Sequence, residues 1–296
     1  MHVNDFIAAA GAAAALSINL FAAPDLEVRS DIEFAKVGDT SLKLDAYIPK
    51  GAGQYSTIVW VHGGGFVAGD KKQFPPFVLN PIFDAGFAMI SLNYRLAPKD
   101  PFPAATDDVE TGLHYIKQHA AEFRVNPGKL FLMGESAGGL LVSVVGAKAR
   151  PENRVTGVIS FYGEHDLITR VSENPCIMDG RSEPMAPGGC LSPGIAAFLG
   201  IKEVTPENMK IVRDASAVTY VRKDMPPYLL IHGTREFHVP FEQAMSLKMA
   251  MDKAGADCTL IPILRGAHGS GGWEKLPQAK EYKEQMVAWL KQHAGF

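Results

Sequence analysis

Apolar residues recur along the chain in runs of four to six residues, and glycine or a polar residue follows each run. Such runs are typical of buried strands in a parallel sheet. They lie at Thr57–Val61, Phe87–Leu92, Leu130–Met133, Val158–Tyr162, Tyr228–Ile231 and Thr259–Leu264. Before them, Ile32–Val37 and Leu42–Ile48 alternate apolar with polar residues around a Gly-Asp pair, which predicts an antiparallel hairpin with one solvated face.

A helical period separates the predicted strands. It covers Pro103–Gln118, a stretch that begins at Leu140, Phe241–Ala254 and Gln278–His293. Acidic residues near the start of the first of these stretches favour the helix dipole. Strands and helices therefore alternate, which predicts the α/β class with a mostly parallel central sheet and helices on both faces.

One segment, Gly163–Glu207, has no regular period. It is rich in Gly, Pro, Cys and Met and holds only short apolar groups. A segment of this length inside an otherwise periodic domain indicates a functional insertion over a site. We therefore expect one domain over residues 29–296, with an irregular insertion at about 163–207.

The first 28 residues form an Ala-rich segment with two interpretations. The apolar run and the small residues before Pro24 fit a signal peptide, but Met1–Asp5 contains no Lys or Arg. The alternative is a helix that docks on the domain. A signal peptide would make the protein secreted or periplasmic, whereas a docking helix would leave it cytoplasmic.

Composition restricts the partners. The chain has 296 residues, 47% hydrophobic and 21% charged, with a formal net charge of −3. These values describe an ordinary globular protein, and the length fits one large α/β domain as well as two small ones. A slightly acidic chain without a Lys/Arg block has no electrostatic footprint for nucleic acid or an anionic membrane, and no apolar stretch in its body is long enough to span a bilayer. Neither composition nor pattern fixes an oligomeric state.

The chain has three cysteines, Cys176, Cys190 and Cys258, and no C-x-x-C pair. That spacing excludes a zinc ribbon and a thioredoxin-like motif. Cys176 and Cys190 bracket part of the insertion, so a disulfide between them is plausible if the protein is exported; otherwise both are small loop residues. Cys258 lies in an apolar stretch and is expected to be a buried strand residue.

The main chemical motif is Gly134–Gly138 (GESAG), which lies between a predicted strand and a predicted helix. This is the G-x-S-x-G pattern of a nucleophile elbow, whose glycines let neighbouring backbone pass close to a strained turn. Ser136 is therefore the candidate nucleophile. The backbone N–H of Ala137, at the start of the helix, is a candidate donor to a developing oxyanion.

A serine nucleophile needs a base and a carboxylate that orients the base, and on such a sheet the acid precedes the histidine along the chain. His268 follows the last predicted strand and is expected to be the base. Glu236 is the only carboxylate in the loop after the preceding strand and is the candidate acid. Its rival is Asp166, whose other interpretation is a helix cap.

A glycine loop, His62–Phe66, follows the first predicted buried strand. Because glycines let backbone N–H groups approach an oxyanion closely, Gly64 and Gly65 are expected to act with Ala137 as its donors. His62 is interpreted as shaping this loop.

A metal site is the alternative for some of these residues. His165, Asp166, Glu236 and His238 could gather round a metal ion. No H-E-x-x-H or other ligand spacing supports such a site, so we expect neither a metal nor another cofactor.

Further motifs accompany the serine elbow and the glycine loop: Asn93–Pro98, Phe102–Ala104, Pro227–Gly233 and Gly266–Gly269. Together, over most of residues 30–294, they resemble the α/β-hydrolase esterases, namely the hormone-sensitive-lipase type and the bacterial feruloyl and acetyl-xylan esterase-like enzymes. The resemblance implies the α/β-hydrolase fold and serine carboxylic-ester hydrolysis without metal or cofactor. Glu236 stands where these esterases usually have Asp.

The expected activity is hydrolysis of a small-molecule ester through an acyl-enzyme. Feruloyl or acetyl esters of plant-wall polysaccharides are among the substrates that the resemblance implies. Two alternatives share the motifs: an aryl-formamidase-type amidase, and a non-catalytic binding protein on a hydrolase fold. An ester compared with its matched formamide separates the first, and inertness to acyl phosphonates would indicate the second.

Overall fold

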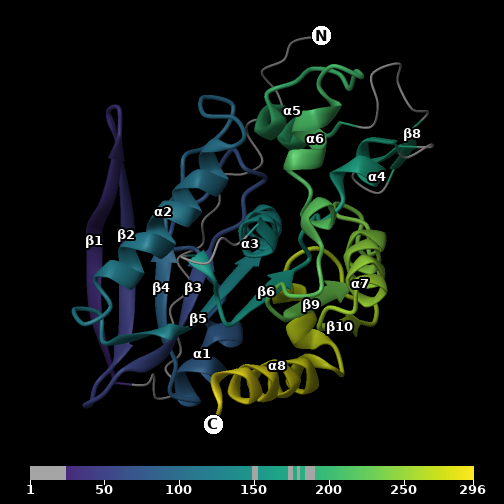
Figure 1. Ribbon diagram of the computed structural model, residues 1–296. Coiled ribbons are helices and arrows are strands. Elements are labelled where there is room, and N and C mark those ends of the chain that lie inside the picture. Colours follow the sequence, from purple (N-terminus) through teal and green to yellow (C-terminus); the bar gives the residue numbers. More distant parts are fainter. Residues whose placement is uncertain (1–24, 149–152, 173–175, 179–180, 184–190) are drawn as a thin grey trace.

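Figure 1 shows the computed structural model of the chain, which describes residues 25–148, 153–172, 176–178, 181–183 and 191–296. A central sheet has the strand order β1-β2-β4-β3-β5-β6-β9-β10. Its strands are β1 (Leu26–Val37), β2 (Thr40–Pro49), β3 (Tyr55–Val61), β4 (Ala88–Leu92), β5 (Val125–Glu135), β6 (Gly157–Phe161), β9 (Tyr228–Gly233) and β10 (Cys258–Ile263). The β1/β2 and β2/β4 pairs are antiparallel and the other neighbouring pairs are parallel, so the hairpin and the mostly parallel sheet are confirmed.

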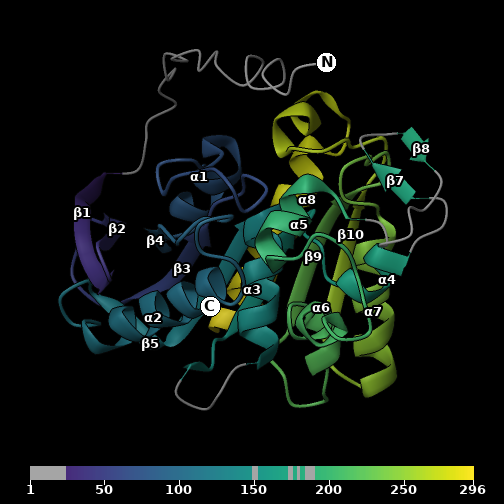
Figure 2. The ribbon, with the colours of Figure 1, turned by 90° about the horizontal axis from the view of Figure 1, so that it is seen from above.

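Helices cover both faces of the sheet, as Figures 1 and 2 show. On one face pack α1 (Pro76–Asp84) and α8 (Ala279–Ala294), and on the other α2 (Ala104–Gln118), α3 (Ala137–Lys148) and α7 (Glu242–Ala254). Successive strand residues enter opposite cores, so Val59 packs with α2 and α3 while Ile58 packs with α1 and α8. Burial on both faces explains why the strands read as continuous apolar runs.

Three of the expected helices, α2, α7 and α8, lie within one residue of their expected bounds. No sequence pattern predicted α1, α6 (Met209–Asp214) or the short 3-10 helices η3 (Ala217–Tyr220) and η4 (Ser270–Lys275). Three prolines at the start of and inside α1 hid that helix, because proline usually interrupts a helical pattern. Pro76, however, lies in the first turn, where no backbone N–H is needed.

The insertion contains short elements: α4 (Leu167–Ser172), β7 (Cys176–Met178), β8 (Arg181–Glu183) and α5 (Pro193–Leu199). Elements of three to seven residues are too short for a period to reveal them. Phe198 of α5 stacks on Phe66 of the glycine loop, with 4.0 Å between ring centroids. The Phe198 carbonyl also accepts the backbone N–H of Phe102 at 2.6 Å. The insertion is therefore packed directly on the glycine loop.

Two expectations fall on residues outside the described ranges. The leader or docking helix lies within residues 1–28, of which 1–24 are not described, and the side chains of Cys176 and Cys190 are not described either. Cys258 begins β10 and is buried, as predicted. In the part of the chain that the structure describes, no helix combines the length and the apolar character that crossing a membrane requires.

Candidate active site

Ser136 lies in the turn between β5 and α3 and has a left-handed backbone, with φ of +51°. This conformation is costly for a residue with a side chain, and a nucleophile elbow requires it. A Cβ at Gly138 would lie 2.1 Å from the Val61 carbonyl oxygen, and one at Gly134 would lie 2.5 Å from the Gly138 carbonyl oxygen. Both glycines of the motif are therefore required by close backbone packing.

The structure brings Ser136, His268 and Glu236 together. Ser136 Oγ lies 3.0 Å from His268 Nε2, and His268 Nδ1 lies 2.8 Å from Glu236 Oε2. The histidine and the glutamate follow β10 and β9, which are parallel neighbours, so their carboxyl ends meet at one edge of the sheet. In this geometry the imidazole can accept the serine proton while the carboxylate holds the other ring N–H.

The Glu236 side chain is fully buried and bonded at both oxygens. Its Oε1 accepts the backbone N–H groups of His238 at 2.7 Å and Val239 at 3.3 Å. Burial alone would raise the pKa of Glu236, but the hydrogen bond and the charge of His268, together with the two N–H groups, lower it. Glu236 is therefore held ionised and keeps the proton of neutral His268 on Nδ1.

Asp166, the rival acid, is engaged elsewhere. Its Oδ1 accepts the backbone N–H of Thr169 at 3.1 Å, and its Oδ2 accepts the hydroxyl of Ser246 at 2.6 Å. Asp166 thus caps the start of α4, which is the structural role that the sequence offered for it. Among the residues described, no group of three or more His, Cys, Asp or Glu side chains could hold a metal ion.

Gly64 and Gly65 lie beside Ser136 with left-handed backbones, at φ of +115° and +59°. A Cβ at Gly64 would lie 2.1 Å from the Ala68 carbonyl oxygen, so only glycine fits there. Ala137 is the first residue of α3 and also lines the cavity at Ser136. The three residues proposed as oxyanion donors therefore lie around the serine.

His62 is buried in the glycine loop and shapes it, as predicted. Its ring stacks on Tyr94 with 4.3 Å between centroids, and its Nδ1 lies 2.7 Å from the Gly63 carbonyl oxygen. The Tyr94 hydroxyl donates to the His62 carbonyl at 3.0 Å. Burial lowers the pKa of His62, so the ring is neutral near pH 7.

A buried lysine that no sequence pattern predicted anchors the chain just after the glycine loop. Lys71 is 2% exposed, and its Nζ lies 3.0 Å from Asp45 and 2.8 Å from Asp31. Burial alone would lower the pKa of Lys71, but its bonds to the two carboxylates raise it. The partners come from the N-terminal hairpin, so no local pattern around Lys71 signals the contact.

The residue before the nucleophile, Glu135, forms a second polar contact at the site. The Tyr162 hydroxyl donates to Glu135 Oε2 at 2.6 Å and accepts the backbone N–H of Ser270 at 3.3 Å. The Tyr162 ring also packs edge-on against His268, with 4.9 Å between centroids. Burial raises the pKa of Glu135. Tyr162 therefore links the serine turn to the loop that carries the histidine.

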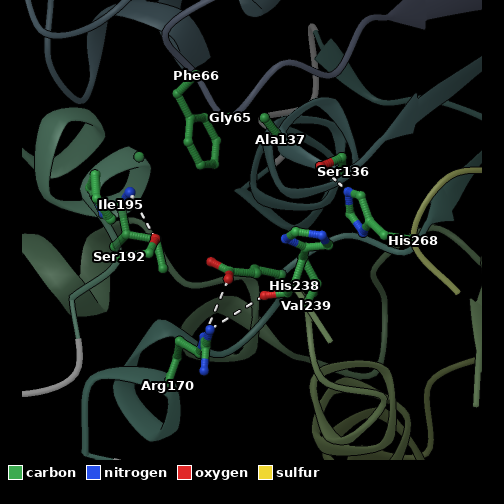
Figure 3. A pocket seen from close by; sticks show the side chains of 13 residues that line it. Gly65, Phe66, Ser136, Ala137, Arg170, Ser192, Ile195, His238, Val239 and His268 are labelled. Carbon is green, nitrogen blue, oxygen red and sulfur yellow. Dashed lines mark hydrogen bonds and ion pairs between the residues drawn. The ribbon is translucent and has the colours of Figure 1, made fainter. Parts of the chain in front are cut away.

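Two cavities meet at Ser136 and His268. The inner cavity measures about 300 Å³, and Figure 3 shows Arg170, Ser192 and Ile195 of the insertion beside it. Its side-chain lining includes Phe66, Glu164, Arg170, Ile195, His238 and Val239. The outer groove measures about 600 Å³, is more open, and is lined by Gln73, Phe74, Pro75, Phe77 and Tyr162. The two cavities therefore offer separate spaces, both next to Ser136, for the two halves of a molecule that the serine attacks.

A serine elbow, a histidine and a carboxylate at the carboxyl edge of a mostly parallel sheet define an α/β-hydrolase fold. Within that class the chain belongs to the BD-FAE family, whose model matches residues 44–251.

Named relatives are carboxylic ester hydrolases and lipases. The chain is 27% identical over 258 residues to "Probable carboxylic ester hydrolase LipM" of Mycobacterium tuberculosis, which covers 82% of the chain and 57% of that protein. It is 38% identical over 112 residues to carboxylic ester hydrolase LipN of the same organism, and this match covers 38% of the chain and 30% of LipN. It is 30% identical over 167 residues to human hormone-sensitive lipase, and this match covers 56% of the chain and 15% of the lipase. The chain thus matches little more than half the length of LipM and less of the other two.

Solved structures share the fold over most of the chain. A truncated form of a carbohydrate esterase from gut microbiota has a TM-score of 0.76 at 24% identity and covers 91% of this chain and 97% of its own. A bacterial heroin esterase has a TM-score of 0.73 at 22% identity and covers 93% and 86%. These likenesses establish the α/β-hydrolase architecture that the strand order shows.

Proposed function

We propose that the protein is a serine carboxylesterase that works through an acyl-enzyme. The observation that carries the proposal is the chain of contacts Ser136–His268–Glu236 at the junction of two cavities. Membership of the BD-FAE family and the likeness to carboxylic ester hydrolases LipM and LipN support it.

The geometry supports a two-step reaction. His268 Nε2 takes the Ser136 proton as Oγ attacks the ester carbonyl, and the N–H groups of Gly64, Gly65 and Ala137 stabilise the oxyanion. His268 then gives the proton to the leaving alcohol, which leaves an acyl group on Ser136. A water that His268 deprotonates attacks this acyl group, and return of the proton to Ser136 Oγ releases the acid.

The finer proposal is that the ester belongs to a plant-wall polysaccharide, as a feruloyl or acetyl group. A likeness to an acetyl ester-xyloside bifunctional hydrolase from Caldicellulosiruptor lactoaceticus supports it, with a TM-score of 0.73 at 22% identity over 89% of this chain and 96% of that one. The half-buried rings of Phe74 and Phe77 in the outer groove offer apolar faces for a sugar or a feruloyl ring.

Hydrolysis of nitrophenyl esters from acetate to long-chain acyl groups, and of methyl ferulate, tests the function. The natural protein should cleave at least one ester, and Ser136→Ala should lose about a thousandfold or more of that kcat/KM because the nucleophile is gone. A matched aryl formamide serves as the comparison substrate. Faster cleavage of the formamide would favour an amidase, and equal rates for the natural protein and Ser136→Ala would overturn the mechanism.

A further inference from the structure

The inner cavity has a buried ion pair in its wall. Glu164 and Arg170 are 7% and 1% exposed, and Glu164 Oε1 lies 3.4 Å from Arg170 Nε. Arg170 Nη2 also donates to the His238 carbonyl at 3.3 Å. Figure 3 shows Arg170 on the far side of the cavity from Ser136 and His268.

Core packing does not account for the position of this pair. Burial of two charges costs desolvation free energy, and apolar side chains of similar size commonly give equal or greater stability. Phe66, Ile195 and Val239 show that apolar residues line the same cavity. An apolar substrate group lying against the pair would cover polar atoms without bonding to them, which costs binding free energy.

The charges of the pair restrict what it can bind. A cationic group beside Glu164 would also lie close to the guanidinium of Arg170, and an anionic group would lie close to the carboxylate of Glu164. The pair as a whole carries no net charge. A neutral group with O–H donors fits best, because a carboxylate accepts hydroxyl hydrogen bonds strongly without requiring a positive partner.

We propose that Glu164, oriented by Arg170, binds hydroxyl groups of the ester substrate in the inner cavity and so determines specificity. This inference rests on the proposed esterase function and extends it to the chemistry of one half of the substrate. The hydroxyl groups could belong to the acyl half, as in a hydroxy acid, or to the alcohol half, as in a sugar ring.

Two matched pairs of esters distinguish these sources. Methyl lactate and methyl propionate differ by one hydroxyl on the acyl half. A mono-acetylated methyl xyloside and tetrahydropyran-4-yl acetate compare similar rings with and without hydroxyls on the alcohol half. The natural protein should prefer the hydroxylated ester by about tenfold or more in kcat/KM in one of the pairs, because a site built for a hydroxyl rejects the analogue that lacks it.

Two variants then test the assignment through the ratio of the two kcat/KM values. A ratio measured on one preparation does not depend on the folded fraction. Glu164→Gln should lower the preference several-fold, and the double variant Glu164→Leu/Arg170→Met should bring it close to one. Glu203→Gln, an exposed position in the same insertion, is the matched control and should keep the natural ratio.

The outcomes separate the subsite from the function. If the natural protein cleaves none of the esters, including the nitrophenyl series, the esterase proposal falls and the subsite with it. If it cleaves esters but shows no preference for hydroxyls, or if both variants keep the preference, only the subsite is overturned. A strong preference for the cationic ester acetylcholine over its neutral analogue 3,3-dimethylbutyl acetate would also overturn the proposal, since it would reveal a site for cations.

Discussion

Glu236 lies one methylene farther from its backbone than an aspartate carboxylate would, and the loop around it uses that length. One carboxylate oxygen accepts the backbone N–H groups of His238 and Val239, while the other accepts the ring N–H of His268. Because the backbone of its own loop holds the first oxygen, the second oxygen has a fixed direction. A glutamate can therefore orient the histidine as an aspartate does elsewhere.

At the level of single residues, we predict that Glu236→Gln lowers kcat for a nitrophenyl ester by about a thousandfold or more. The amide NH2 group can donate to His268 Nδ1, which would place the ring proton on Nε2 and leave no acceptor for the Ser136 proton. Steady-state kinetics on correctly folded protein, checked by circular dichroism, measure the effect.

Asp166→Asn is the control for this prediction, because Asp166 bonds to Thr169 and Ser246 rather than to the histidine. Its kcat per folded molecule should stay within a few-fold of the natural value. A large loss in Asp166→Asn together with near-normal activity in Glu236→Gln would assign the acid to Asp166 instead.

At the scale of elements, the turn between β5 and α3 depends on how closely two backbones approach. The start of α3 lies against the end of β3, so a Cβ on Gly138 would come 2.1 Å from the Val61 carbonyl oxygen and 2.5 Å from that of His62. Val61 is the last residue of β3, and His62 is the first residue of the glycine loop. The same contact therefore holds the nucleophile turn and the oxyanion loop at a fixed separation.

We predict that Gly138→Ala lowers the free energy of unfolding by about 3 kcal/mol or more, because backbone atoms on both sides must move. Urea unfolding followed by circular dichroism measures this loss, and nitrophenyl acetate hydrolysis should fall with it. Gly271→Ala is the matched control, since its added Cβ would meet no atom within 4 Å apart from its own neighbours along the chain. Its stability should change by less than about 1 kcal/mol. Equal stabilities of the two variants would show that the β3–α3 contact is not rigid.

Elements were predictable where a pattern is local. The runs that became β3 to β6, and the period of α2 and α7, lie within single segments, so burial left a direct trace in the sequence. For α1 and α5, tertiary packing decided the structure. Phe198 of α5, for example, is buried because it meets Phe66 from a distant loop. No window of sequence contains both residues.

Across the whole molecule, some residues of the site follow a local sequence pattern, whereas others depend on packing between segments. Ser136 and His268 were predictable because glycine turns after strands mark them, and Glu236 because it is the single carboxylate of its loop. Lys71 and Arg170 were not, because charged residues usually lie in solvent. The partners of Lys71, Asp31 and Asp45, come from the distant hairpin. Arg170 pairs with Glu164, which lies six residues before it, and also donates to the carbonyl of the distant His238. The catalytic residues thus lie in recognisable sequence motifs, whereas the charged residues of the cavity wall do not.

Besides His62, two buried histidines near the site, His165 and His232, affect the stability of the whole molecule. Burial lowers the pKa of His165 to about 3 and that of His232 to about 4. The His165 ring has no hydrogen bond to any described residue, and His232 Nε2 lies 2.9 Å from the Val239 carbonyl oxygen. Near neutral pH both rings are uncharged in the folded protein. Histidines of the unfolded chain are mostly uncharged there too, so folding releases few protons and this costs little free energy.

Acid changes that balance in a definite direction. In the unfolded chain a histidine takes up its proton near pH 6.5, but the two buried rings do so only near pH 3 to 4. Lowering the pH below about 6.5 therefore stabilises the unfolded state, by about 2 kcal/mol per histidine at pH 5. Glu135 opposes part of this loss, since its raised pKa lets the folded state take up a proton first.

We therefore predict that the free energy of unfolding, measured in urea from pH 8 to 4.5, falls with acid below pH 6.5. In His165→Leu the slope should be smaller by about 1.4 kcal/mol per pH unit near pH 5, because one proton fewer is taken up on unfolding. His114→Leu, at an exposed position on α2, should keep the natural slope. If His165→Leu also kept it, the acid sensitivity would have to come from other groups, and the buried imidazole would not be the neutral ring that its surroundings require.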